Sequence, residues 1–232
     1  MSTLADAKSP LDSVEWPTKL VARVVSPGAR PTVHGYDVEG DLARDYSFAE
    51  TVLLALTGEA PEPDLGRAFE LVLVFAAPVS VVEAPVHAAV VARACVASPS
   101  QLLGVAALGL AEQTRVLVEG LRGFLDALSG NIQDVAPRYC ASSDEERASV
   151  GRLRAGLAPF LHVPGLTFDL GRTAAIVAAL HACGLRTAEQ IECALSWARL
   201  PLLLAEALAA KPGSHMQYPV NVPAIVYEEQ QP

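Results

Sequence analysis

Apolar residues recur every three to four positions along most of the 232-residue chain, a spacing typical of helices packed on one face. Ser47 and Glu50 form a capping box ahead of the first apolar run, and Gly58 provides the usual stop. The same signals predict further helices over residues 64–77, 86–97, 99–128, 144–158, 170–183 and 188–210. The pattern therefore predicts an all-α, multi-helix globule.

The two ends of the chain lack this periodicity and are rich in proline. We therefore predict an N-terminal arm over residues 1–33, a helical domain over 34–211 and a C-terminal arm over 212–232. Alternation of apolar and polar residues is convincing only over 20–25, so no substantial sheet is expected.

Composition narrows the class of protein. A hydrophobic content of 51% with 19% charged residues excludes intrinsic disorder, and a net charge of −9 without a basic stripe argues against nucleic-acid binding. The N-terminus has no apolar segment of the kind found in signal peptides, and Pro99 interrupts the longest uncharged stretch. We predict a soluble cytoplasmic protein with no membrane contact.

The four cysteines form no CxxC pair and no disulfide framework, so we predict neither structural zinc nor another metal site. Nucleotide-binding and hydrolase motifs are also missing, and no cofactor is predicted. Cys183 and Cys193 lie in apolar helical runs and are expected in the core, while Cys140 is expected in a loop.

Two residues are candidates for nucleophilic chemistry, which needs a thiolate with an imidazole in hydrogen-bond reach. Cys95 lies near the end of a predicted helix, where the helix dipole disfavours a thiolate, and its alternative role is a small buried core residue. His34 lies in the glycine-bearing turn PTVHGYD, and its alternative role is a turn residue that bonds the backbone.

Two charged residues stand out in apolar surroundings. Asp169 directly precedes a predicted helix, so it is either that helix's N-cap or a carboxylate held rigidly in a cleft. Arg199 interrupts the last apolar helix, and it either extends its charge to solvent or binds a buried anion.

Three segments in order resemble the citrate synthase and citryl-CoA lyase superfamily. They are HGYDVEGDLARDYSFAETVLLALTGEAPEPDL, VARACVASPSQLLGVAALGL, and LTFDLGRTAAIVAALHACGL followed by SWARLPLLLAEAL. The resemblance implies a citrate-synthase-like helical catalytic domain. It also implies that Asp169 matches the catalytic aspartate and Arg199 a carboxylate-binding arginine.

The departures from that pattern argue against a working citrate synthase. Gln113, Thr114 and Arg115 stand where the family carries its catalytic HGG motif, and a histidine-bearing segment is missing between Gly130 and Pro164. The scaffold is therefore expected to be shortened.

These departures resemble the thiol-dependent Dieckmann cyclases of bacterial tetramate and pyridone biosynthesis. That resemblance implies a catalytic triad of Cys95, His34 and Asp169, with Tyr36 and Arg199 binding the substrate. The substrate would be a β-ketoacyl-aminoacyl thioester on the phosphopantetheine of a carrier protein, and the superfamily's dimers suggest a homodimer. Two alternatives stay open: a cysteine-independent carbon–carbon lyase or Claisen-type enzyme on CoA thioesters, and a non-catalytic member of the superfamily.

Overall fold

The computed structural model describes residues 19–130 and 134–213, and the chain divides into two compact units between Glu59 and Ala60. Most of the two predicted arms, residues 1–18 and 214–232, lies outside the described residues.

The N-terminal unit begins with a small antiparallel sheet of three two-residue strands, β1 (Val25–Ser26), β2 (Thr32–Val33) and β3 (Tyr36–Asp37), in that order. His34 and Gly35 form the turn between β2 and β3, with φ of 47° and 90°. A two-residue hairpin turn of type I′ requires positive φ at both of its central residues. The sheet was not predicted, because strands this short offer too few positions to reveal alternation.

A π-helical turn (Val38–Leu42), the one-turn helix α1 (Ala43–Asp45) and α2 (Phe48–Thr57) complete this unit. The predicted capping box at the start of α2 is confirmed: the Glu50 N–H donates to Ser47 Oγ, and the Ser47 N–H donates to Glu50 Oε2. Gly58 ends the helix in the left-handed conformation, as predicted, and its N–H donates to the Leu54 carbonyl.

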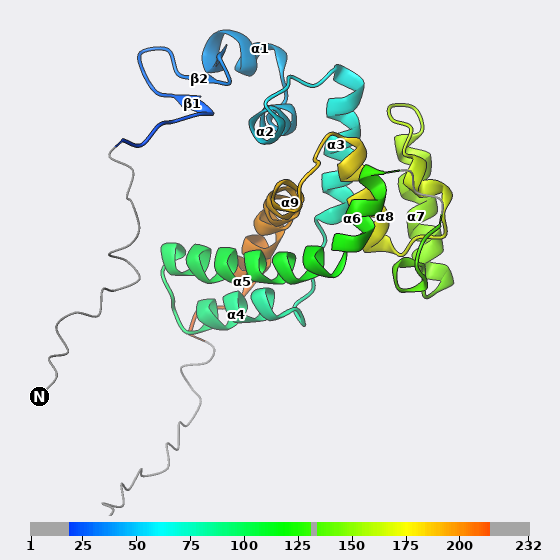
Figure 1. Ribbon diagram of the computed structural model, residues 1–232. Coiled ribbons are helices and arrows are strands. Elements are labelled where there is room, and N and C mark those ends of the chain that lie inside the picture. The colour runs from blue at the N-terminus through cyan, green and yellow to red at the C-terminus, as the bar shows by residue number, and fades with distance from the viewer. Residues whose placement is uncertain (1–18, 131–133, 214–232) are drawn as a thin grey trace, which may run out of the picture. The chain divides into compact units, whose positions relative to one another are not determined.

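Within residues 60–130 and 134–213, the second unit consists of helices joined by turns and loops (Figure 1), and an isolated bridge joins Cys140 and Leu170. The prediction of an all-α fold is confirmed. Its helices are α3 (Pro63–Ala76), α4 (Ala84–Ala94), α5 (Pro99–Gly120), α6 (Arg122–Ser129), α7 (Asp144–Leu157), α8 (Arg172–Ala182) and α9 (Ala188–Ala209), with 3₁₀ turns at Pro137–Tyr139 and Pro164–Thr167. No helix within the described ranges is long and apolar enough to cross a bilayer.

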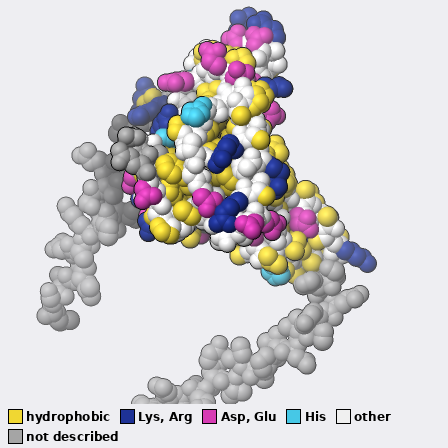
Figure 2. Space-filling model, turned by 90° about the vertical axis from the view of Figure 1, so that its right-hand side faces the viewer, with side chains coloured by type: hydrophobic (Ala, Val, Ile, Leu, Met, Phe, Trp, Pro, Cys, Tyr) yellow, Lys and Arg dark blue, Asp and Glu magenta, His cyan; other side chains and the backbone are white. Residues whose placement is uncertain are grey.

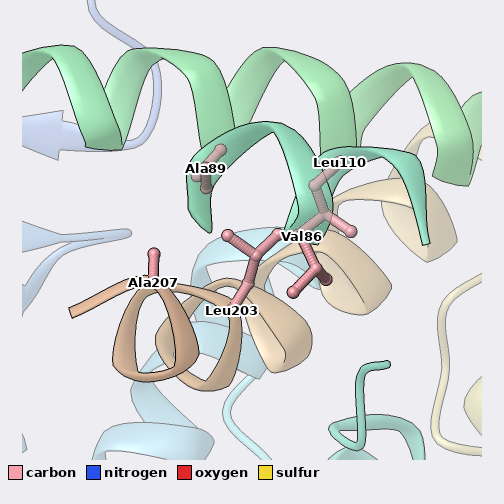
Figure 3. Packing of buried hydrophobic residues seen from close by; sticks show 6 residues of the cluster. Val86, Ala89, Leu110, Leu203 and Ala207 are labelled. Atoms are coloured by element: carbon pink, nitrogen blue, oxygen red, sulfur yellow. The ribbon is translucent and has the colours of Figure 1, made fainter. Parts of the chain in front are cut away.

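Helices α4, α5 and α9 pack against one another around a shared apolar core (Figure 3). Leucines and valines fill the space between the helices, while alanines let the backbones approach closely. The fully buried members of this core are Val86, Ala89, Ala106, Leu110, Leu203 and Ala207.

Helix α8 lies at the centre of the remaining helices and contacts α3, α6, α7 and α9. All of residues 174–181 are buried, so this helix has no solvent-facing stripe. A helix that is apolar on every side is buried on every side. Arg172, the charged residue at its start, is partly buried.

Two expectations about helix ends are wrong. The helix predicted over 99–128 is broken at Leu121, which has non-helical dihedral angles and separates α5 from α6. Asp169 is not an N-cap, because α8 begins at Arg172 after Gly171. Instead, Glu146 of α7 accepts the Arg172 N–H at 3.0 Å, so a carboxylate from another helix satisfies this terminus.

Candidate active site

A cavity of about 500 Å³ opens within the helical unit, between α3, α5, α8, α9 and the start of α4. Its charged and amide-bearing side chains are Glu83, Gln113, Arg172 and Arg199. Thr114 and Thr173 add hydroxyl groups. The rest of the wall is apolar and consists of Phe75, Ala76, Pro78, Leu117, Ile176 and Leu195.

Glu83, Gln113 and Arg199 form one hydrogen-bonded network across three helices. Arg199 Nη2 donates to Glu83 Oε2, and Gln113 Nε2 donates to the same oxygen at 2.9 Å. Arg199 Nη1 lies 3.5 Å from Gln113 Oε1. The two charged side chains are only 22% and 13% exposed, for Glu83 and Arg199 respectively. The pair is therefore shielded from most of the screening that weakens surface ion pairs.

The network holds Glu83 in its ionised form. Burial by itself raises the pKa of this carboxyl, but hydrogen bonds from Arg199 and Gln113 outweigh it and lower the pKa below the ordinary value. Glu83 is therefore a weak proton acceptor near neutral pH, and its role in the cavity is electrostatic.

Arg172 contributes a second guanidinium, held by neutral acceptors. Its Nη1 donates to Ser149 Oγ at 2.5 Å and its Nη2 to the Phe75 carbonyl at 2.6 Å. Among the described residues, its guanidinium forms no ion pair. One carboxylate and two guanidiniums thus line the cavity, which leaves one positive charge in excess.

The two charged residues singled out from the sequence lie in different hollows. Arg199 lines the cavity and binds a buried anion, the Glu83 carboxylate, so the alternative of a solvent-directed charge is wrong. Asp169 lines a separate hollow of about 300 Å³ with Arg147. It is 55% exposed and accepts from Arg147 Nε at 3.1 Å.

Cys95 ends α4 and is exposed, so its alternative role as a buried core residue is wrong. The next residue, Val96, has a φ of 66°, an outlier for a β-branched side chain. Cys183 is buried as expected, and burial raises the pKa of its thiol to about 12. Cys193 is exposed, contrary to its expected core position.

His34 and Tyr36 belong to the N-terminal unit. His34 Nε2 lies 3.4 Å from the Ala55 carbonyl of α2 and can donate to it in the tautomer protonated at Nε2. The Tyr36 ring packs edge-on against Tyr46, with ring centroids 6.3 Å apart. His34 thus bonds the backbone, one of its two expected roles. The triad of Cys95, His34 and Asp169 stays a prediction.

Sequence reasoning did not identify Glu83 or Arg172 as site residues. Arg172 carried a usable signal, since it is a lone charge at the start of an apolar helix, as Arg199 is within another. Glu83 carried none, because an acidic residue just before a helix is ordinary. Within the described ranges, no group of three or more His, Cys, Asp or Glu residues could hold a metal ion.

The exposed charged side chains are mixed in sign, whereas the cavity has one positive charge in excess. On the face drawn in Figure 2, acidic and basic side chains are interspersed with apolar ones. Several of the exposed charges pair within one helix, such as Arg115 with Glu112 in α5 and Arg147 with Asp144 in α7. Pairs of this kind contribute little to stability.

No protein-family model matches the sequence, and no curated protein matches it. Solved structures do match the fold. The chain is similar to citryl-CoA lyase from Hydrogenobacter thermophilus, with a TM-score of 0.62 and 17% identity over 91% of this chain and 96% of that one. The two chains are therefore close in length, and a scaffold this short is not specific to the present protein.

Two ATP citrate lyases are also similar. The enzyme from Methanothrix soehngenii, in complex with citrate and coenzyme A, has a TM-score of 0.57 at 13% identity. The D541A mutant from Methanosaeta concilii, in complex with (3S)-citryl-CoA, has a TM-score of 0.56 at 14% identity. In both cases the match covers 95% of this chain but only 43% of the longer one. The chain thus has a citrate-synthase-like fold, which it shares with citryl-CoA lyase and with part of ATP citrate lyase.

Proposed function

We propose that this protein is an enzyme that makes or breaks a carbon–carbon bond beside the carbonyl group of an acyl thioester. The observation that carries the proposal is the cavity with two guanidiniums, set in a fold that matches citryl-CoA lyase over nearly its whole length. Lyases and Claisen-type enzymes acting on thioesters share one chemical requirement, which this cavity meets.

That requirement is stabilisation of negative charge on oxygen. Removing a proton, or an acyl group, from the carbon next to a thioester carbonyl leaves an enolate with its charge on the carbonyl oxygen. A preorganised cation in a partly dehydrated site stabilises such a charge effectively. Arg172 meets this need, because its guanidinium is fixed by Ser149 and the Phe75 carbonyl without being neutralised by a carboxylate.

The acid–base group is assigned from the resemblance alone. Asp169 matches the family's catalytic aspartate, but it lies in a separate hollow and pairs with Arg147, so its role as the base stays a prediction of the resemblance. Glu83 is unsuited to this role, because Arg199 and Gln113 keep its pKa low. The Asp169→Asn variant tests this role: loss of turnover with thioester binding intact would support it, and unchanged turnover would refute it.

Enolate formation can be measured without knowing the second substrate. The protein is incubated in deuterated buffer with acetyl-CoA and with propionyl-CoA, and deuterium at the carbon beside the thioester is quantified by mass spectrometry. Citryl-CoA is tested in parallel for cleavage. We expect enzyme-dependent exchange or cleavage that falls about a hundredfold in Arg172→Gln, the scale of losing one oxyanion-stabilising donor.

Arg152 of α7 provides the matched control, since it is exposed and does not line the cavity. Arg152→Gln should react like the unchanged protein. Neither exchange nor cleavage above the rate in buffer, for any of the three thioesters, would refute the proposed lyase or Claisen-type activity.

A Dieckmann cyclase is the second candidate, favoured by the exposed Cys95 next to the strained Val96. Strained backbone persists where its surroundings enforce it and clusters at functional sites. The Cys95 thiolate would attack the thioester carbonyl and release the pantetheine thiol. A carbanion formed at the carbon between the two carbonyls of the β-ketoacyl group would then attack the carbonyl of the resulting acyl-cysteine. This step closes the ring and releases the Cys95 thiolate. His34 would act as base and Asp169 would orient it.

Intact-mass analysis separates the two candidates. A β-ketoacyl-aminoacyl thioester of N-acetylcysteamine stands in for the substrate on the carrier protein. A cyclase should form an acyl adduct that disappears in Cys95→Ala and persists in Cys193→Ala, the matched change at another exposed thiol. A cysteine-independent enzyme forms no adduct and keeps its activity in Cys95→Ala. Failure of both assays would leave the non-catalytic alternative.

A further inference from the structure

We infer that Glu83 is a built-in carboxylate ligand of Arg199, so that the cavity selects acyl thioesters whose acyl group carries no carboxylate at this position. The inference deepens the proposed function, since it names the class of acyl group, and it rests on that function for the thioester itself. Glu83 is thereby a specificity-determining residue.

Both oxygens of the Glu83 carboxylate are engaged. Oε2 accepts from Arg199 Nη2 and from Gln113 Nε2, and Oε1 accepts from the Ser80 N–H at 2.8 Å. A guanidinium binds a substrate carboxylate through the same kind of charge-assisted hydrogen bonds. Glu83 thus already makes the contact that a substrate carboxylate would seek at Arg199.

The backbone fixes Glu83 in this position. Its N–H donates to the Ser80 carbonyl at 2.9 Å, which closes a turn immediately before α4. Its own carbonyl accepts the His87 N–H, so the residue is tied into the first turn of that helix as well. A substrate carboxylate would therefore have to displace a side chain that is held at both its backbone and its carboxyl end.

Displacement is costly because the site is largely buried. A second carboxylate beside Glu83 would place two like charges around one guanidinium that is 13% exposed. Moving Glu83 away would leave a charge with few water contacts and without its partners. Arg172 keeps the remaining positive charge of the cavity, which is then free for the reacting oxygen.

The test measures binding of citrate to the full-length protein by titration calorimetry at pH 7 and constant ionic strength. Glu83→Gln keeps the size of the side chain and frees the Arg199 charge. We expect citrate to bind Glu83→Gln about tenfold or more tightly than the unchanged protein, the scale of one charge-assisted ion pair. The double variant Glu83→Gln with Arg199→Gln should lose that gain.

Glu112→Gln is the matched control, because it removes the same charge from an exposed pair on α5. Far-ultraviolet circular dichroism confirms that each variant is folded, and Glu83→Ala replaces Glu83→Gln if the latter is not. An equal gain in Glu112→Gln, no gain at Glu83, or a gain that survives loss of Arg199 would overturn the inference.

The result of the citrate titration is independent of the deuterium-exchange assay. Exchange without a citrate gain would support the proposed function and refute the role of Glu83. A citrate gain with neither exchange nor cleavage would support the role of Glu83 at Arg199 and refute the thioester chemistry.

Discussion

Two ion pairs of the helical unit differ in almost every respect. Glu83 and Arg199 are 116 positions apart in the chain, are largely buried, and share Gln113 as a third partner. Asp169 and Arg147 are about half exposed, and Arg147 also pairs with Asp144 within its own helix. The first pair lines a cavity of about 500 Å³ and the second a hollow of about 300 Å³.

The difference shows how little a residue's chemical type says about its role. The sequence singled out Asp169 as the functional carboxylate, yet the carboxylate in the cavity that Arg199 lines is Glu83. Solvent decides the strength of each pair, since water and salt screen exposed charges and much less so buried ones. The two pairs should therefore respond very differently to the same kind of substitution.

The largest effect is expected from the core that supports the buried pair. Leu203 lies one turn after Arg199 on α9 and is fully buried against α4 and α5 (Figure 3). Leu203→Ala should lower the free energy of unfolding by about 3 kcal/mol, through lost apolar burial and the cavity left behind. Urea denaturation measures the loss. Leu202, 43% exposed on the same helix, is the control, and equal losses at both positions would contradict the packing described.

The next largest effect on stability is expected from breaking the two ion pairs themselves. Arg199→Gln leaves Glu83 charged, largely buried and short of its main partner, so unfolding free energy should fall by about 2 kcal/mol. Arg147→Gln removes an exposed pair and should lower the unfolding free energy by much less than Arg199→Gln does, and by less still at high salt. Chemical denaturation at two salt concentrations compares them. A larger loss for Arg147→Gln would reverse the comparison.

The smallest effect is the dependence of stability on pH. Folding lowers the pKa of Glu83, so the unfolded chain binds this proton more tightly than the folded one. The stabilisation is therefore complete above the ordinary glutamate pKa and is lost as the pH falls through the lowered folded-state value.

Glu83→Gln tests this sign. The variant should be less stable than the unchanged protein at neutral pH, and the difference should shrink as the pH falls below the ordinary glutamate value. Thermal unfolding across a pH series measures it, with Glu112→Gln as the exposed control. A difference that grows toward acid would show that the sign is wrong.

Much of the secondary structure was predictable because its causes lie within four residues. The capping boxes before α2, α5 and α9 pair a side chain with a backbone N–H three positions on, and Gly58 ends α2 through its own backbone freedom. These interactions form in any context that allows a helix. The periodic apolar positions likewise predicted the class of fold.

Helix ends that depend on distant partners were not predictable. The start of α8 is satisfied by Glu146 of α7, so the sequence next to that helix gave no cap to find. The break at Leu121 separates two helices whose apolar pattern runs on without interruption. At the start of α8, a tertiary contact thus replaces the local signal.

The candidate site divides in the same way. Arg199 stood out in the sequence because a charge inside an apolar helix must find a partner or reach solvent. The packing of α4, α5 and α9 decides that Arg199 finds a partner and does not reach solvent. It also decides that this partner is Glu83, with Gln113 beside it. Local rules identify a residue whose burial demands compensation. Only the arrangement of helices in space brings the compensating charge within reach. Electrostatic pairing depends on the distance between the charges and on the exclusion of water, and neither follows from separation along the chain.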